Sequence, residues 1–352
     1  GSETLKRLLD GATTPSECRQ PVADRLDTSD STASNWIDRD SIPVAVLLEL
    51  FDRGELLERI PTDVELSIHR DTAAVPRMVE LDEDMACLLG WYAAKGYTRV
   101  APGEHYHTTI CTPEPAVRTD LSDTFDRVVN VDASHENDSK LTVSSRLVTV
   151  LFSEIFDAGT CAETKRIPPA LLSAGRPALR TFLASYFSGD GSTATDRVGL
   201  RARTVSDELT KDLIAALSRF GISATCDTEV RSPETGVVPE RYEGQPHKFQ
   251  TWVLQITSEN AVRFADEIGF SLDPKQQTLK TTLREHETRT QRVFGDGGDV
   301  WLDEITDVEY VRSDVEYTYC LTVPDTHTLV ANDLYTGQCD GDEDCVMLLL
   351  DG

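Results

Sequence analysis

The sequence lacks membrane-spanning segments and an export signal. None of its 352 residues falls in an apolar run of the roughly 18 residues that a membrane-spanning helix needs. The first residues also lack the charged and apolar regions of a signal peptide. We therefore expect a soluble, cytoplasmic protein with no membrane partner.

Paired cysteine motifs are missing as well. The chain has 8 cysteines, but no two of them stand in the Cys-x-x-Cys spacing of zinc or redox sites. Their scattered positions exclude a zinc framework and a regular disulfide scaffold. We expect most of them to be small core residues.

Positive charge is scarce. The sequence has 34 basic and 61 acidic residues, which gives a formal net charge of −27. It therefore lacks the broad basic surface by which many nucleic-acid-binding proteins hold phosphates. An acidic surface also keeps proteins of extreme halophiles dispersed in molar salt, where the Debye length is about 3 Å. We interpret the acidity as adaptation to high salt, not as a sign of the partner.

Near the end of the chain, a β-rich segment meets an acidic motif at the bond between Gln338 and Cys339. The segment reads YCLTVPDTHTLVANDLYTGQ, and CDGDED follows it. The first part resembles the C-terminal splicing region of inteins, which excise themselves and join their flanks. The resemblance implies that Gln338 cyclises onto its own carbonyl, Cys339 accepts an acyl group, and His327 polarises the scissile carbonyl. Cys320 falls in the same block, and splicing needs no cofactor.

Two departures from the intein pattern bear on the rate of splicing. The family usually has His-Asn before the junction, whereas this chain has Gly337 and Gln338. Gln forms a six-membered glutarimide more slowly than Asn forms a succinimide, so we expect slow cleavage.

The first 80 residues contain neither a strand led by Cys or Ser nor a Thr-x-x-His motif. We therefore expect the chain to be the C-terminal part of an intein.

Two similar helical motifs lie in the middle of the chain. LLGWYAAKG occupies residues 88–96 and LASYFSGDG occupies residues 183–191. Small residues at their third, sixth and seventh positions would let two helices pack closely, and a terminal glycine would end each helix. Both resemble the LAGLIDADG motif of homing endonucleases. The resemblance implies an α/β (α+β) fold in which two αββαββα-like units form a pseudo-two-fold saddle on double-stranded DNA.

Residue patterns after each motif predict matching elements. After the second motif we expect strands over 197–204, 222–230 and 249–256, a helix that begins after Ser206, and a helix over 258–269. After the first we expect strands over 106–112 and 141–144 and helices over 116–129 and 145–156.

The eighth motif position decides the chemistry that the resemblance implies. In the family it supplies one acidic Mg²⁺ ligand from each helix. Here it is Asp190 in the second motif but Lys95 in the first. A lysine cannot bind Mg²⁺, and beside Asp190 it would form an ion pair that competes with the metal. We therefore expect DNA cleavage to be impaired.

Further positively charged residues belong to the predicted endonuclease. Lys165 in KRIPPALL and Lys275 in EIGFSLDPKQQTL match family blocks, and the resemblance implies that such a lysine assists near the scissile phosphate. Lys165 could otherwise be a surface residue. Arg201 and Arg203, on the strand after the second motif, are predicted to contact DNA. His105 and His107 could share a metal, although a DNA-facing or solvated strand is the simpler interpretation.

The N-terminal part predicts a small helical module. Ser29 or Asp30 can cap a helix that runs to Arg39, and Pro43 opens another. The pattern resembles a repressor-type helix-turn-helix. It would present five side chains to a major groove, namely Ser31, Thr32, Ser34, Asn35 and Arg39. The alternative is a three-helix bundle with Trp36 and Ile37 in its core and no DNA contact.

After the junction, CDGDED resembles the catalytic motif of the large subunit of the archaeal family-D DNA polymerase. There Asp340 and Asp342 would bind Mg²⁺ for nucleotidyl transfer. The alternative is a generic Asp-rich loop of the kind that binds Ca²⁺. The expected partners are the host polymerase segments that flank the intein, the polymerase small subunit, and double-stranded DNA at the empty insertion site.

These inferences predict five regions. They are a helix-turn-helix-like module over 1–60, a linker over 61–80, the endonuclease domain over 81–295, splicing strands over 298–338, and the start of the host segment over 339–352. The alternative to an impaired homing endonuclease is a non-catalytic DNA-binding protein that keeps the same scaffold.

Overall fold

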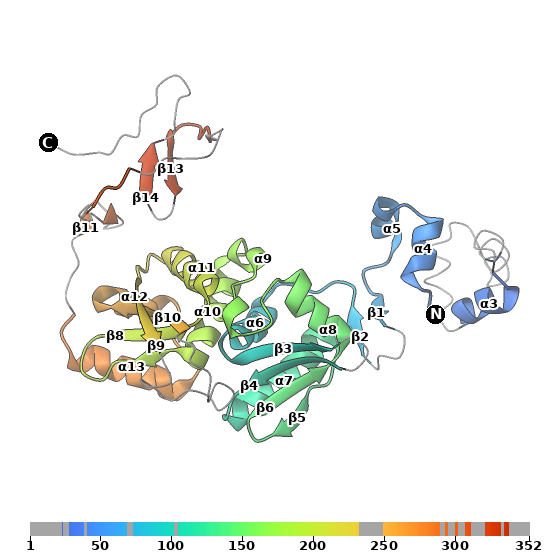
Figure 1. The fold of residues 1–352 in the computed structure, drawn as a ribbon, viewed down its shortest axis with the longest axis horizontal. Coiled ribbons are helices and arrows are strands. Elements are labelled where there is room, and N and C mark those ends of the chain that lie inside the picture. Colours follow the sequence, from blue (N-terminus) through green and yellow to red (C-terminus); the bar gives the residue numbers. More distant parts are fainter. Residues whose placement is uncertain are drawn as a thin grey trace. The chain divides into compact units, whose positions relative to one another are not determined.

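The fold was analysed in a computed structural model that describes most of the chain (Figure 1). It describes residues 23, 28–38, 41–68, 73–101, 105–231, 249–288, 293–294, 300–301, 307–310, 321–331 and 334–337. The chain divides into two compact units. The first comprises residues 1–85 and 98–155, and the second comprises residues 86–97 and 156–352.

The first unit is built on a four-stranded sheet of order β3-β4-β6-β5. Its strands are β3 (Gly96–Ala101), β4 (His105–Cys111), β5 (Ser134–Asn137) and β6 (Lys140–Ser144), with β6 antiparallel to both β4 and β5. The helices are α7 (Pro115–Val129) and α8 (Arg146–Val150), which continues as a π-helical turn over Leu151–Ile155. Phe125 of α7 and Phe152 are buried with their ring centres 6.0 Å apart. They form part of the core of this unit.

The second unit repeats this element order. Its sheet has the order β7-β8-β10-β9. The strands are β7 (Ser192–Thr193), β8 (Gly199–Thr204), β9 (Thr225–Arg231) and β10 (Phe249–Thr257). Helix α11 (Asp207–Ser218) separates the two strand pairs, and α12 (Ser258–Glu267) follows them. Along the chain, α6 (Glu83–Lys95) precedes the first sheet and α10 (Arg176–Asp190) precedes the second, so both segments read helix–strand–strand–helix–strand–strand–helix, which confirms the predicted α/β fold.

Local signals explain several of these boundaries. The side chain of Ser206 accepts a hydrogen bond from the N–H of Leu209 at 3.1 Å, so it caps α11 as predicted. Gly221 follows α11 at a φ of +68°, a conformation that favours glycine. The sequence analysis missed the short strands β3, β5 and β7. Two further helices, α9 (Pro169–Leu172) and α13 (Asp273–Glu285), complete the second unit.

The two motif helices pack closely within the second unit. They are α6 (Glu83–Lys95), which belongs to this unit from Ala86 onward, and α10 (Arg176–Asp190). A Cβ added to Gly90 would lie 2.5 Å from the carbonyl oxygen of Phe182, and one added to Gly189 would lie 2.5 Å from Cβ of Ala94. Small residues are therefore required at this contact, as the motif pattern predicted.

The N-terminal module contains α3 (Asp30–Asp38), α4 (Val44–Leu50) and α5 (Arg53–Arg59). The N–H of Thr32 donates to the Ser29 side chain, and α4 begins after Pro43, as predicted. Within the residues predicted as a linker, β1 (Glu65–Ser67) pairs with β2 (Ala74–Pro76). Arg77 directly follows β2, and its guanidinium donates to the carbonyls of Leu57 and Ile60 at 2.6 Å.

Short strands follow α13. β11 (Val293–Phe294) pairs with β12 (Val300–Trp301), and β13 (Thr328–Ala331) pairs with β14 (Leu334–Gly337). Six predicted site residues lie outside the described residues: Arg39, Cys320, Gln338, Cys339, Asp340 and Asp342. Across the part of the chain that the structure describes, no helix has the length and apolar character needed to cross a membrane.

Candidate functional site

The two eighth motif positions meet at the C-terminal ends of α6 and α10. Lys95 is the last residue of α6 and Asp190 is the last residue of α10. Nζ of Lys95 lies 2.5 Å from Oδ1 of Asp190, and the two side chains are 39% and 22% exposed. The expected ion pair is therefore present. A cation at the end of α6 is also favoured by the partial negative charge of a helix C-terminus.

Asp190 lies in a mixed electrostatic environment. Burial raises the pKa of its carboxyl, while Lys95 and, more weakly, Lys275 and Lys165 act to lower it. Burial is the largest effect because a carboxylate loses hydration when it is withdrawn from water. The site thus contains one carboxylate that interacts with three lysines.

Lys165 is buried in this site. Its side chain is 2% exposed, and Nζ lies 3.0 Å from the ring centre of Tyr92 on α6. Among the described residues, Nζ has no hydrogen-bond partner. Burial lowers the pKa of Lys165 well below its usual range, although Cys161 and Asp190 act in the opposite direction. The alternative of a surface residue is therefore wrong.

The segment that carries Lys165 is fixed by α11. The hydroxyl of Ser206 donates to the carbonyl oxygen of Lys165 at 2.5 Å, and the N–H of Ile167 donates to Oδ2 of Asp212 at 2.9 Å. Burial raises the pKa of Asp212, whereas this backbone hydrogen bond lowers it. The sequence analysis identified Ser206 only as a helix cap and missed Asp212, because both act on a segment some 40 residues away.

Lys275 is bound to the end of α10. Its Nζ donates to the carbonyl oxygens of Ser188 at 2.6 Å and Gly191 at 2.7 Å. These carbonyls lie in the last turn and just after it, where a helix leaves acceptors unpaired. The ammonium therefore caps α10 and offsets the partial negative charge at its end.

The residues present do not fit a magnesium ion. Mg²⁺ prefers several oxygen ligands, but the only motif carboxylate, Asp190, is held by the ammonium of Lys95. Asp84, near the start of α6, is paired with Arg127 at 2.6 Å. The described residues contain no group of three or more His, Cys, Asp or Glu that could hold a metal ion. His107 is half-buried on β4, and the side chain of His105 lies outside the description.

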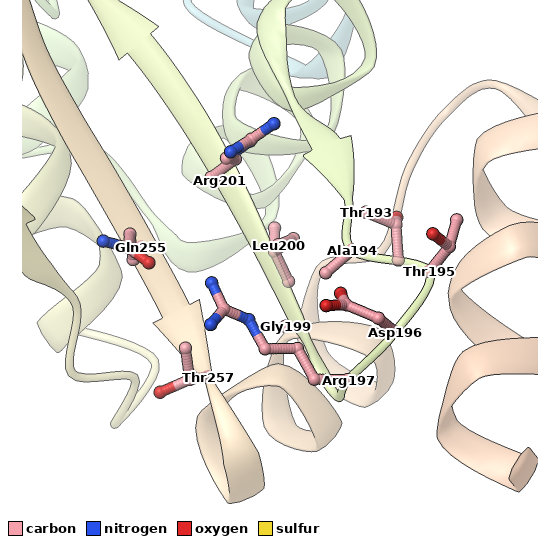
Figure 2. A pocket seen from close by; sticks show the side chains of 10 residues that line it. All are labelled: Thr193, Ala194, Thr195, Asp196, Arg197, Gly199, Leu200, Arg201, Gln255 and Thr257. Carbon is pink, nitrogen blue, oxygen red and sulfur yellow. The ribbon is translucent and has the colours of Figure 1, made fainter. Parts of the chain in front are cut away.

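The sheet of the second unit carries a polar hollow of about 300 Å³ (Figure 2). Arg201 on β8 and Gln255 on β10 line it together with the loop between β7 and β8. Arg203, two residues beyond Arg201, has its Nη2 3.6 Å from Oε1 of Glu229. Sequence reasoning found both arginines but missed Gln255, because a single glutamine in a strand carries no motif.

The predicted helix-turn-helix residues lie on α3. Ser31 and Asn35 are exposed, whereas Thr32 and Ser34 are half-buried. The hydroxyl of Ser29 hydrogen-bonds to those of Ser31 and Thr32 at 2.8 and 2.9 Å, so these two groups take part in the cap of α3. Trp36 packs against the buried Ala23 and Ala33, as the bundle interpretation expects.

His327 is the described member of the predicted splicing site. It is exposed, has a φ of +54°, and its N–H donates to the carbonyl of Val323 at 3.3 Å. Pro324–Thr326, between these two residues, form a turn. His327 thus directly precedes β13, which pairs with the strand that ends at Gly337.

Comparisons with known proteins bear on this site. Residues 177–269 match the family model of the LAGLIDADG-like domain. The DNA polymerase II large subunit of Haloquadratum walsbyi is 34% identical over 360 residues, which is 96% of this chain and 16% of that protein. The corresponding subunit of Thermococcus kodakarensis is 30% identical over 325 residues, or 90% of this chain and 18% of that protein. The chain thus spans about a sixth of the length of these relatives.

Solved structures also resemble parts of the chain. The homing endonuclease I-WcaI bound to its DNA recognition sequence matches with a TM-score of 0.40 and 14% identity, over 58% of this chain and 88% of that one. A crystal structure of I-DmoI in complex with DNA and Ca matches with a TM-score of 0.40 and 16% identity, over 57% and 98%. The family match and the polymerase relatives together show that the chain carries a LAGLIDADG-like domain and is homologous, over nearly its whole length, to archaeal DNA polymerase II large subunits.

Proposed function

We propose that the chain is the C-terminal part of an intein in a DNA polymerase II large subunit, and that it carries a homing endonuclease domain with impaired cleavage. The observation that carries this proposal is the 2.5 Å ion pair between Lys95 and Asp190. It occupies the motif position at which homing endonucleases place their acidic ligands. The domain is thus proposed to recognise double-stranded DNA at the empty insertion site.

The proposed impairment follows from charge. Cleavage of a phosphodiester needs an activated water and stabilisation of the leaving oxygen, and a divalent metal such as Mg²⁺ supplies both in metal-dependent nucleases. Here the ammonium of Lys95 takes the place beside Asp190 where a metal would bind. Lys165 and Lys275 remain near Asp190. We assign Lys165 as the amine that assists near the scissile phosphate and Lys275 as a positioning residue for the end of α10.

Replacing Lys95 tests the proposal. Lys95→Asp and Lys95→Glu should cleave DNA that spans the empty insertion site when Mg²⁺ or Mn²⁺ is supplied, while the unchanged chain should cleave it slowly or on one strand only. Lys95→Met is the matched control, because it removes the ion pair without adding a ligand. The double variant with Asp190→Asn should be inactive. If neither acidic variant cleaves, the proposal of an impaired endonuclease fails.

A second candidate is a DNA-binding protein that no longer catalyses cleavage. The ion pair favours it too, because the site as it stands lacks a metal-binding set. In that case all variants should bind the insertion site and none should cleave it. Six of the positions proposed for DNA contact are exposed or half-buried: Ser31, Thr32, Ser34, Asn35, Arg201 and Arg203. Arg39, the seventh, lies outside the described residues.

The remaining parts keep the domain limits predicted above. Residues 81–295 are proposed as the endonuclease domain and 298–338 as the splicing segment, in which His327 polarises the carbonyl that Gln338 attacks and Cys339 accepts the acyl group. Residues 339–352 would start the host segment, in which Asp340 and Asp342 hold Mg²⁺ for DNA synthesis in the complete polymerase. Its small subunit would be a partner of the spliced host.

A further inference from the structure

Arg201 and Gln255 lie next to each other across two strands of the second sheet. In the antiparallel register of β8 and β10, these two residues are direct partners. Both line the polar hollow in Figure 2, where each side chain is drawn on its own strand. Directly opposed residues in an antiparallel pair have Cβ atoms about 4.5–5.5 Å apart. Their polar ends can therefore reach neighbouring groups of one ligand.

Arg201 and Gln255 are available to bind a ligand for different reasons. Among the ion pairs of the described residues, Arg203 is held by Glu229, but Arg201 has no carboxylate partner and is exposed. Nε2 of Gln255 donates to Oδ2 of Asp227 on β9 at 2.5 Å. This hydrogen bond fixes the plane of the amide. It leaves the amide oxygen and the second N–H of Gln255 available.

These groups match the edges of bases in a major groove. The parallel N–H donors of arginine pair with O6 and N7 of guanine, and the acceptor and donor of a glutamine amide pair with N6 and N7 of adenine. Successive base pairs are about 3.4 Å apart. Two side chains that start from opposed positions can therefore reach two successive base pairs, since a two-stranded β-ribbon fits a major groove.

We propose that Arg201 reads a guanine and Gln255 reads an adenine at adjacent base pairs of the DNA target, with Asp227 as the positioning residue for Gln255. This inference rests on the proposed recognition of DNA and adds the base identity at two positions. A contact of Arg201 with a phosphate would instead strengthen binding to all sequences equally.

The test is selection of bound sequences from a random double-stranded DNA library, at the high salt that suits this acidic chain, followed by binding curves. The unchanged protein should select adjacent guanine and adenine at one step of its site. Arg201→Ala should reduce discrimination at the guanine by about 5- to 150-fold and leave the adenine preference intact. Gln255→Ala should do the reverse.

Asp227→Ala should weaken only the adenine preference, because the amide of Gln255 is then free to rotate. Arg180→Ala is the matched control. Arg180 lies on α10, is 45% exposed and is paired with Glu267, so its loss should leave the selected sequence unchanged. A uniform loss of affinity in Arg201→Ala, with unchanged preferences, would overturn the base assignment but keep DNA recognition. Absence of sequence-selective binding by the unchanged protein would overturn both.

Discussion

Lys95 and Asp190 occupy the same position in two related helical motifs and hold each other at 2.5 Å. Each ends its helix, so the pair lies where the partial negative charges of two helix C-termini come together. One positive side chain in this place offsets negative charge that a metal would otherwise offset. The ion pair links the ends of the two helices, and in the proposed function it would also compete with a metal ion for Asp190.

The first prediction concerns stability without metal. Lys95→Asp would place two carboxylates beside two helix C-termini, so we expect the unfolding free energy in EDTA to fall by about 1 kcal/mol. Added Mg²⁺ should restore stability in this variant but not in the unchanged chain. Thermal unfolding with and without Mg²⁺ measures both effects. An equal response of Lys95→Met to Mg²⁺ would show that the new carboxylate is not the ligand.

The second prediction concerns the contact between α6 and α10. In Gly90→Ala the added methyl group would lie 2.5 Å from a backbone oxygen and 2.7 Å from Cβ of Ser185, so the helices must separate. We expect the variant to lose about 1–3 kcal/mol of stability in denaturant unfolding, despite the higher helix propensity of alanine. Gly175→Ala is the control, because its methyl group would meet only Pro177, at 3.6 Å. Equal stability of the two variants would refute the close contact.

The third prediction concerns the cost of burying Lys165. The residue is 2% exposed and its amine has no hydrogen-bond partner among the described residues, so Lys165→Met should raise the unfolding free energy by about 1–3 kcal/mol. The same change in Lys275 should destabilise the protein, because that ammonium caps α10. In the Lys95→Asp background, Lys165→Met should also abolish cleavage. Destabilisation by Lys165→Met would instead show that the contact of the amine with the Tyr92 ring outweighs the cost of its burial.

The fourth prediction concerns pH. The pKa of Asp190 is raised above the ordinary value of 3.8, so just above that pH the folded protein retains a proton that the unfolded chain has released. The contribution of Asp190 to stability should therefore fall as pH rises through this window. Asp190→Asn should flatten that part of a plot of melting temperature against pH.

The carboxyl of Asp84 should contribute to stability with the opposite dependence on pH. A hydrogen bond from Arg127 lowers the pKa of Asp84, so its contribution is present above the ordinary value and is lost as pH falls. As pH falls below the ordinary value, Asp84→Asn should therefore lose less stability than the unchanged chain. If Asp190→Asn and Asp84→Asn changed the plot of melting temperature against pH in the same direction, the opposite pKa shifts of the two carboxyls would be contradicted.

The fifth prediction concerns the proposed splicing junction. Gln338→Asn should speed cleavage of the bond before Cys339, because a five-membered imide closes faster than a six-membered one. Gel analysis of the released C-terminal peptide over time measures the rate. His327→Ala should slow cleavage in the same background. An unchanged rate in Gln338→Asn would show that cyclisation at this residue does not limit cleavage.

Much of the fold could be predicted from local patterns. Ser206 caps its helix, Pro43 precedes another, and the apolar residues of 249–256 form a strand, because each of these signals acts within a few residues. The strands β3, β5 and β7 were missed because none of them contains a buried apolar residue that would give an alternating pattern. The predicted linker contains the pair of β1 and β2, and Arg77 after it binds carbonyls 17 and 20 residues away, contacts that no local pattern reveals.

The sequence by itself determined the two motifs, the replacement of an acidic residue by Lys95, and the glycines that let the helices approach, because residue identity alone sets charge and volume. Only the tertiary structure decided that Lys95 reaches Asp190, that Lys165 is buried on Tyr92, and that Lys275 caps α10. These outcomes depend on segments 70–95 residues apart folding against one another. Burial and hydrogen bonding, which no single segment contains, then give three similar lysines three different roles.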